Sequence, residues 1–300
     1  MVKFCLVVGM AMAIWLGFNL SGAEATVHAS NPLGVGVNFF LQGEYEEAIE
    51  EFNQLEALTT EDSGLVHNYL CKAYLYLGNH GAALASCGQA IALTPRNQEA
   101  HLHQGLAYYQ LSQYDQAIEA YHRAITLQPT DFRGYYHQGL AYFALGDLDN
   151  ALASYNQALQ RCVMAYNKTK ALIYSDRGLT YLALEQLPQA IEDLSLAIQL
   201  NPKDVMSYYH RACACHEHHH YEQAIADFSA VLAEHPDYTE VYMYRGLSHH
   251  QLGHNQPAIK DLKLAMEQFE QQNNQRKYQE ARQYLQSLQK AIVNYGEVIV

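Results

Sequence analysis

Apolar and small residues recur along most of the chain at two spacings, one of three to four residues and one of 34. The short spacing, as in Ala151, Tyr155 and Ala158, places side chains on one face of an α-helix. The long spacing separates Gly105 from Gly139, Ala117 from Ala151, Ala124 from Ala158, and Tyr108 from Tyr142. A fixed period of this length indicates an internal repeat. No strand-like run interrupts it, so the sequence predicts an all-α protein.

Each period contains two helices and a turn. In the segment Leu145-Gly146-Asp147, glycine can adopt the left-handed conformation that ends one helix, and Asp147 can cap the next. The end of the second helix is marked in several periods by a proline, which cannot continue the helical hydrogen bonds. These prolines are Pro95, Pro129, Pro202 and Pro236. Each repeat is therefore predicted to be a helix hairpin.

Small residues such as Gly105 and Ala117 would let the two helices of a hairpin approach closely, while Tyr108 and Tyr121 would fill the space around them. This arrangement resembles the tetratricopeptide repeat family. The resemblance implies a right-handed superhelical α-solenoid of tandem helix hairpins with a C-terminal capping helix. It covers about seven repeats, which begin near Ala29, Gly64, Gln98, Phe132, Ala171, Val205 and Thr239.

The repeats fall into two blocks. Gly139 and Gly178 are 39 residues apart instead of 34, which places a joint near residues 161–170. We expect block 1 at 26–163, with a degenerate first repeat, and block 2 at 164–270. Residues 271–300 are expected to form the capping helix and tail. Their apolar stripe consists of Tyr278, Ala281, Leu285, Leu288, Ile292 and Tyr295.

Block 2 carries charges that block 1 lacks at the same places in the repeat. Arginine occupies position 7 and aspartate position 23 of each of its three repeats. The pairs are Arg177 with Asp193, Arg211 with Asp227, and Arg245 with Asp261. We expect each arginine to bind the aspartate of its own hairpin, a structural use of charge.

The N-terminal segment combines Lys3 with an apolar run and then small residues near Ala23 and Ala25. Residues 1–25 are expected to be a signal peptide or, if uncleaved, a membrane anchor. Either predicts an exported protein that is periplasmic, lumenal or secreted, or anchored facing outside the cytoplasm. Any contact with the membrane would be through this segment alone.

Charge and motifs restrict the function. The net charge of −13 disfavours nucleic acid as a partner. The sequence contains no phosphate-binding glycine loop and no nucleophile-elbow motif, so we expect a protein without enzymatic activity. The leading hypothesis is a scaffold or adaptor that binds protein partners and supports the assembly of a complex.

In the family that the chain resembles, first helices line a concave groove that binds an extended peptide or a helix. The corresponding side chains here are apolar and aromatic, and we expect about half to pack between helices instead. They are Leu102, Leu106, Tyr109, Tyr136, Leu140, Phe143, Leu179, Leu182, Tyr209, Met243 and Leu247. We expect Tyr136, Phe143 and Tyr209 to serve binding more than stability.

Some members of the family hold a partner's terminal carboxylate with a clamp of lysine, asparagine and arginine. The corresponding residues here are Asn68, Lys72, His103, Arg133 and His137, which match that clamp only in fragments.

Histidine and cysteine leave two questions open. Residues 216–220 match the pattern H-E-x-x-H, but the repeat places them at the end of a first helix and its turn, which argues against a metalloprotease. The alternative function is a metal-binding repeat protein that holds Zn²⁺, Ni²⁺ or Cu²⁺ weakly through His216, His220 and His250; otherwise the turn is simply solvated, with no cofactor. Cys71 and Cys87 face each other in one hairpin and form either a disulfide or a buried apolar contact.

Overall fold

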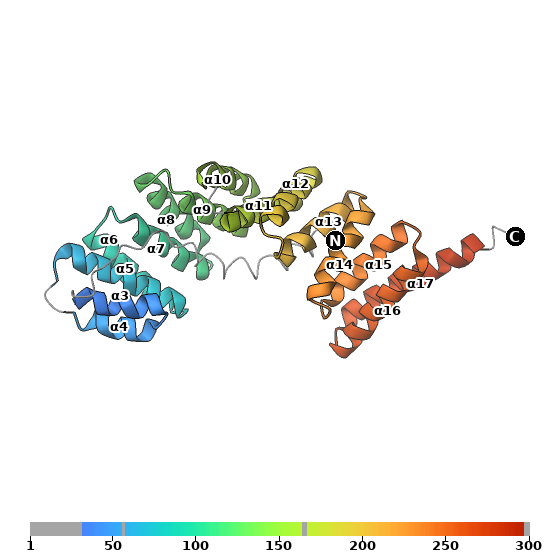
Figure 1. The fold of residues 1–300 in the computed structure, drawn as a ribbon, viewed down its shortest axis with the longest axis horizontal. Coiled ribbons are helices and arrows are strands. Elements are labelled where there is room, and N and C mark those ends of the chain that lie inside the picture. Colours follow the sequence, from blue (N-terminus) through green and yellow to red (C-terminus); the bar gives the residue numbers. More distant parts are fainter. Residues whose placement is uncertain (1–31, 56–57, 164–166, 297–300) are drawn as a thin grey trace. The chain divides into compact units, whose positions relative to one another are not determined.

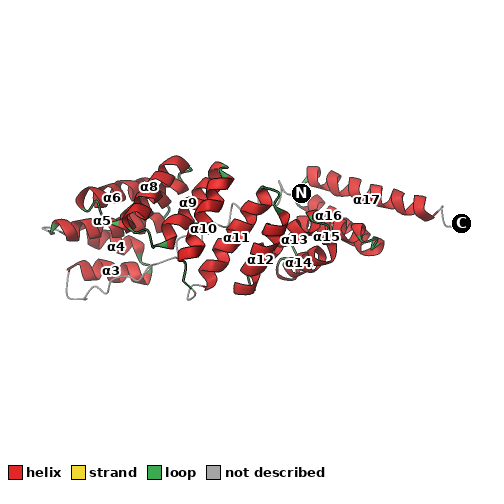
Figure 2. Ribbon diagram, turned by 90° about the horizontal axis from the view of Figure 1, so that it is seen from above, coloured by secondary structure: helices red, strands yellow, loops and turns green. Residues whose placement is uncertain are grey.

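The computed structural model describes residues 32–55, 58–163 and 167–296. They form helices joined by short turns, with no strand among them (Figure 2). The predicted signal segment lies outside the described residues. By internal contacts the chain divides into two compact units, and the boundary between Thr169 and Lys170 lies in the region of the predicted joint.

The described residues of the N-terminal unit form four helix hairpins, from α3 to α10 (Figure 1). Its helices are α3 (Pro32–Gln42), α4 (Tyr45–Asn53), α5 (Thr60–Tyr76), α6 (His80–Leu93), α7 (Gln98–Gln110), α8 (Tyr114–Leu127), α9 (Phe132–Leu145) and α10 (Leu148–Arg161). Each helix packs against the next along the chain. The first helices of successive hairpins also contact one another; for example, α5 contacts α7. This identifies the first helices as the inner layer of the unit.

The C-terminal unit repeats the same plan with three hairpins and a final helix. It contains α11 (Asn167–Ala183), α12 (Leu187–Leu200), α13 (Val205–Glu217), α14 (Tyr221–Glu234), α15 (Thr239–Gln251), α16 (Asn255–Gln271) and α17 (Gln275–Gly296). Helix α17 covers α16 with the buried side chains of Ala281, Leu285 and Leu288. The polar far side of α17 allows the stack of hairpins to end in water, so the capping helix is confirmed.

The turns follow the predicted chemistry. Gly146 has a φ of 85°, and the Asp147 side chain accepts a hydrogen bond from the backbone N–H of Asn150. The second helices α6, α8, α12 and α14 end two residues before the four boundary prolines. His219 takes the left-handed conformation without being glycine, with a φ of 62°. It stands where the repeat pattern placed it, in the turn after a first helix.

The two helices of a hairpin are held close by the glycine at position 8. A Cβ atom added at Gly139 would lie 2.7 Å from the Tyr155 ring, which is almost fully buried. The large ring of the second helix therefore occupies the space that the small residue of the first helix leaves. The same contact recurs between Gly105 and Tyr121.

Replacing Gly139 by alanine is therefore expected to lower the free energy of unfolding by about 1–3 kcal/mol, because the buried ring must move. Gly88→Ala in α6 is the matched control, since a Cβ there meets nothing within 4 Å. That substitution should raise stability by about 0.5–1 kcal/mol through helix propensity. Urea denaturation followed by circular dichroism measures both. Equal effects of the two substitutions would contradict this packing argument.

The facing cysteines of the second hairpin form a disulfide. The sulfur atoms of Cys71 and Cys87 are 2.06 Å apart, the Cα atoms are 5.2 Å apart, and both residues are fully buried. The bond links α5 to α6 at positions 8 and 24 of the repeat. Of the two alternatives that the sequence left open, the structure has the disulfide.

Candidate functional site

The candidate binding surface is the face formed by the first helices. Of the eleven side chains predicted to line it, seven are buried between helices: Leu102, Tyr136, Leu140, Leu179, Leu182, Tyr209 and Met243. Four remain half-buried, namely Leu106, Tyr109, Phe143 and Leu247. The surface open to a ligand is therefore narrower than the sequence suggested, and three of its four members lie on α7 and α9.

Tyr136 and Tyr209 require a correction. They are 1% and 0% exposed, so they support the hairpins and present no surface to a partner. Tyr136 contacts the Tyr155 ring at a centroid distance of 6.2 Å, and Tyr209 stacks on Tyr238 at 5.4 Å. Alanine at either position should act first on stability. Phe143 keeps its predicted accessibility.

A charged network lies between α7 and α9 in the N-terminal unit. The Arg133 guanidinium binds the carboxylates of Glu99 and Asp131, and Gln98 Nε2 donates to Asp131 Oδ2 at 2.8 Å. Burial alone would raise the pKa of Asp131, but the hydrogen bonds and charge of Arg133 hold it below its usual value. Two acids that the clamp comparison did not include therefore surround the single cation of the network, Arg133.

Two buried histidines extend this network. His103 Nδ1 lies 3.0 Å from Asn68 Oδ1, and His137 stacks on the Tyr121 ring at 5.6 Å. Burial lowers the pKa of each to about 3, and the nearby charge of Arg133 acts in the same direction. Both imidazoles are therefore neutral at physiological pH.

The five clamp-like residues therefore do not form a free carboxylate site. Glu99 already occupies Arg133, and Lys72 lies 4.9 Å from the centre of the Phe40 ring. A partner's carboxylate would have to displace Glu99 from Arg133. A sequence signal for Glu99 existed, because it stands one period before Arg133 in the repeat. Asp131 caps α9 and stands one period after Asn97, which caps α7, so the repeat marks it as a helix cap and not as a partner of Arg133.

The C-terminal unit contains the predicted arginine–aspartate pairs, and each is bidentate. The Nε to Oδ2 distances are 2.7 Å for Arg177 with Asp193, 2.8 Å for Arg211 with Asp227, and 2.8 Å for Arg245 with Asp261. The aspartate side chains are at most 4% exposed. These pairs tie the two helices of each hairpin together, as the sequence predicted.

The arginines also reach the preceding hairpin. Arg211 Nη1 donates to Ser195 Oγ and Arg245 Nη1 to Ser229 Oγ, both at 3.0 Å. Each of these arginines therefore connects three helices. The two serines are 34 residues apart, so they occupy the same position in consecutive repeats.

The histidine-rich turn does not bring the three predicted metal ligands together. Helix α13 ends at Glu217, so the H-E-x-x-H residues do not share one helix. His216 Nδ1 is 2.7 Å from Ser248 Oγ, and burial lowers the pKa of His216 to about 4. Within the part of the chain that the structure describes, no group of three or more histidine, cysteine or acidic side chains is arranged to hold a metal ion.

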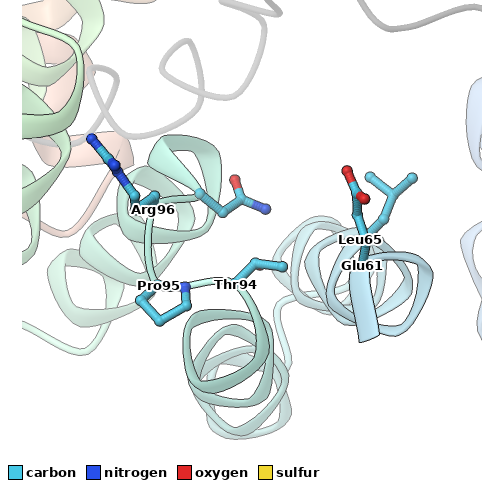
Figure 3. Close-up of a pocket in the computed structure, with 6 residues that line it drawn as sticks. Glu61, Leu65, Thr94, Pro95 and Arg96 are labelled. Carbon is cyan, nitrogen blue, oxygen red and sulfur yellow. The ribbon is translucent and has the colours of Figure 1, made fainter. Parts of the chain in front are cut away.

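Two shallow clefts accompany these features. The first, of about 410 Å³, has Glu61 and Leu65 on one side and Arg96 on the other, with Thr94 and Pro95 between them (Figure 3). Charges of both signs border it, so it favours neither an anion nor a cation.

The second cleft, of about 450 Å³, lies beside Arg211 and Cys215. Burial raises the pKa of the Cys215 thiol to about 11, so the thiol is protonated at neutral pH and is a poor nucleophile. His219, His220 and Glu222 also line this cleft.

Antiparallel hairpins with small residues at their crossing points define the class of protein as a helical-repeat solenoid. Sequence profiles described as TPR repeat or tetratricopeptide repeat match residues 105–146, 132–162, 171–204 and 216–273, which together cover half of the chain. The chain belongs to the tetratricopeptide repeat family. A separate comparison with curated protein sequences finds no match.

Solved structures share the fold. PilF of Pseudomonas aeruginosa is 16% identical, with a TM-score of 0.64 over 75% of this chain and 99% of that one. PilW, a type IV pilus biogenesis factor, is 17% identical with a TM-score of 0.59, covering 69% and 93%. YrrB, described as having an unusual peptide-binding site, is 17% identical with a TM-score of 0.58, covering 67% and 100%. These structures show that the chain has the tetratricopeptide repeat fold, which supports protein–protein interaction.

No helix among the described residues is long and apolar enough to cross a membrane.

Proposed function

We propose that this protein is a non-enzymatic scaffold that binds an extended peptide or a helix of a protein partner along the first-helix face of its N-terminal unit, and so supports the assembly of a complex. The observation that carries the proposal is the accessible set of Leu106, Tyr109 and Phe143 on the neighbouring helices α7 and α9. Aromatic side chains offer a large contact area with little rotamer entropy to lose.

The setting of these side chains supports a peptide ligand. The Tyr109 ring rests against Tyr114 at a centroid distance of 5.5 Å, which holds it in place before binding. On the same helix as Leu106 and Tyr109, the Glu99 side chain is 38% exposed, so it can accept hydrogen bonds from a ligand backbone. YrrB, with its described peptide-binding site, has the same fold.

Export is part of the proposal. The Cys71–Cys87 disulfide is typical of oxidising compartments, which agrees with a signal peptide or anchor in residues 1–25. The protein would then act in a periplasmic, lumenal or extracellular space.

The double variant Tyr109→Ala/Phe143→Ala should reduce partner capture at least about tenfold, because aromatic anchors carry most of the binding energy of an interface. Immobilised wild-type and variant proteins are compared by quantitative mass spectrometry of what they retain from the native compartment. Tyr284→Ala is the matched control, since Tyr284 is 40% exposed on α17 and is not part of the proposed face. Capture that falls equally with the control variant, or does not fall at all, contradicts the proposal.

A further inference from the structure

Two pairs of histidines occupy equivalent turns of consecutive hairpins in the C-terminal unit. His218 Nδ1 lies 3.3 Å from His220 Nε2 in the turn between α13 and α14. His249 Nδ1 lies 3.4 Å from His254 Nδ1 at the turn between α15 and α16. Both contacts are exposed to solvent. Of the three metal ligands that the sequence suggested, only His220 belongs to one of these pairs.

The backbone fixes both pairs. His218 is the C-cap residue of α13 and His220 the N-cap residue of α14, and the His220 N–H donates to the Cys215 carbonyl at 2.7 Å. In the next hairpin the His254 N–H donates to the His249 carbonyl at 2.9 Å. The imidazoles are therefore held near each other by turn geometry before any ligand arrives.

The spacing of the ring nitrogens matches one edge of a tetrahedral zinc site. Zinc–nitrogen bonds are about 2.0–2.1 Å long, so a tetrahedral angle places two ligand nitrogens about 3.3–3.4 Å apart. A right angle, as in square-planar copper or octahedral nickel sites, would place them about 2.9 Å apart. The observed distances of 3.3 and 3.4 Å fit the tetrahedral arrangement better.

We propose that each histidine pair is a two-ligand binding site for Zn²⁺, with water in the remaining coordination positions. Without metal, one ring N–H of each pair can donate to the facing nitrogen. Zinc binding needs both facing nitrogens unprotonated, so the donor ring carries its proton on its other nitrogen. Between two neutral rings this is a change of tautomer, which releases no proton. Because only two protein ligands meet at each site, the ion exchanges freely and is not needed for folding.

Isothermal titration of the full, untagged chain with ZnCl₂ at neutral pH tests the proposal. Two equivalents are expected to bind. His220→Gln and His254→Gln should each weaken one of the two sites at least about tenfold, and the double variant should lose both. His122→Gln, which changes an exposed histidine of α8, should leave the titration unchanged.

Two results of this titration would contradict the zinc proposal. Absence of binding at a molar excess of zinc, or zinc binding that persists in the double variant, would overturn the proposal. Matching far-UV circular dichroism of all variants separates loss of a site from loss of fold. The sites lie on turns and not on the first-helix face, so this result is independent of partner binding.

Discussion

Replacing Arg211 by methionine is expected to lower the free energy of unfolding by about 3–5 kcal/mol, because it leaves a buried carboxylate without its cation. The Asp227 side chain is 3% exposed and accepts two hydrogen bonds from the guanidinium, one from Nε and one from Nη2. The substitution also removes the bond to Ser195 that connects two hairpins. Urea denaturation followed by circular dichroism at neutral pH measures the loss.

A double variant distinguishes the charge from the packing. Arg211→Met/Asp227→Leu removes both charges and fills the space with apolar atoms, so it should recover most of the stability that the single variant loses. The exposed pair of Arg123 and Glu119, with side chains 65% and 63% exposed, supplies the control. Arg123→Met should cost less than about 1 kcal/mol. An Arg211→Met variant as stable as the wild type would show that the buried pairs do not hold the hairpins together.

Stability is also expected to fall steeply as the pH drops from about 6.5 towards 4.5. Burial lowers the pKa of His103 and His137 to about 3 and that of His210 to about 4. Below pH 6.5 the unfolded chain binds protons at these positions while the folded chain does not, so protonation favours unfolding. Each of these histidines lowers the free energy of unfolding by about 1.4 kcal/mol for each pH unit of acidification, and the three together lower it by about 4 kcal/mol per pH unit.

His210 provides the variant that checks this assignment. Neither of its ring nitrogens has a hydrogen-bond partner among the described residues, and the side chain is 3% exposed. His210→Leu should therefore reduce the pH dependence of the free energy of unfolding by about 1.4 kcal/mol per pH unit, without lowering stability at neutral pH. Denaturation curves between pH 6.5 and 4.5 give the slope, with the exposed His122→Gln as control. An unchanged slope in His210→Leu would refute the role of this histidine.

The repeat period predicted those features that recur in every hairpin. The arginine–aspartate pairs followed from residues that change together at positions 7 and 23, and the structure confirms all three. The turn at Gly146, the helix-ending prolines and the capping helix α17 also follow from local sequence. Such features depend on neighbouring residues or on one repeat, so a single sequence is enough to infer them.

Accessibility could not be predicted in the same way. Helical spacing places Tyr136 and Phe143 on the same helix face, yet only Phe143 remains half-exposed. The difference depends on how closely the neighbouring helices approach, which no single repeat encodes. The network of Arg133 with Glu99 and Asp131 was missed for a related reason, because it joins two hairpins of block 1 and has no counterpart in block 2.

The central claim is that the first-helix face of the N-terminal unit is a docking surface for a protein partner. Site-specific photocrosslinking in the native compartment tests it most directly, with the crosslinker placed at Leu106 on α7 or, as control, at the exposed Arg123 on α8. We expect a discrete protein adduct from position 106 and none from position 123. Adducts of the same protein in equal yield from both positions, or no adduct from position 106, would contradict it.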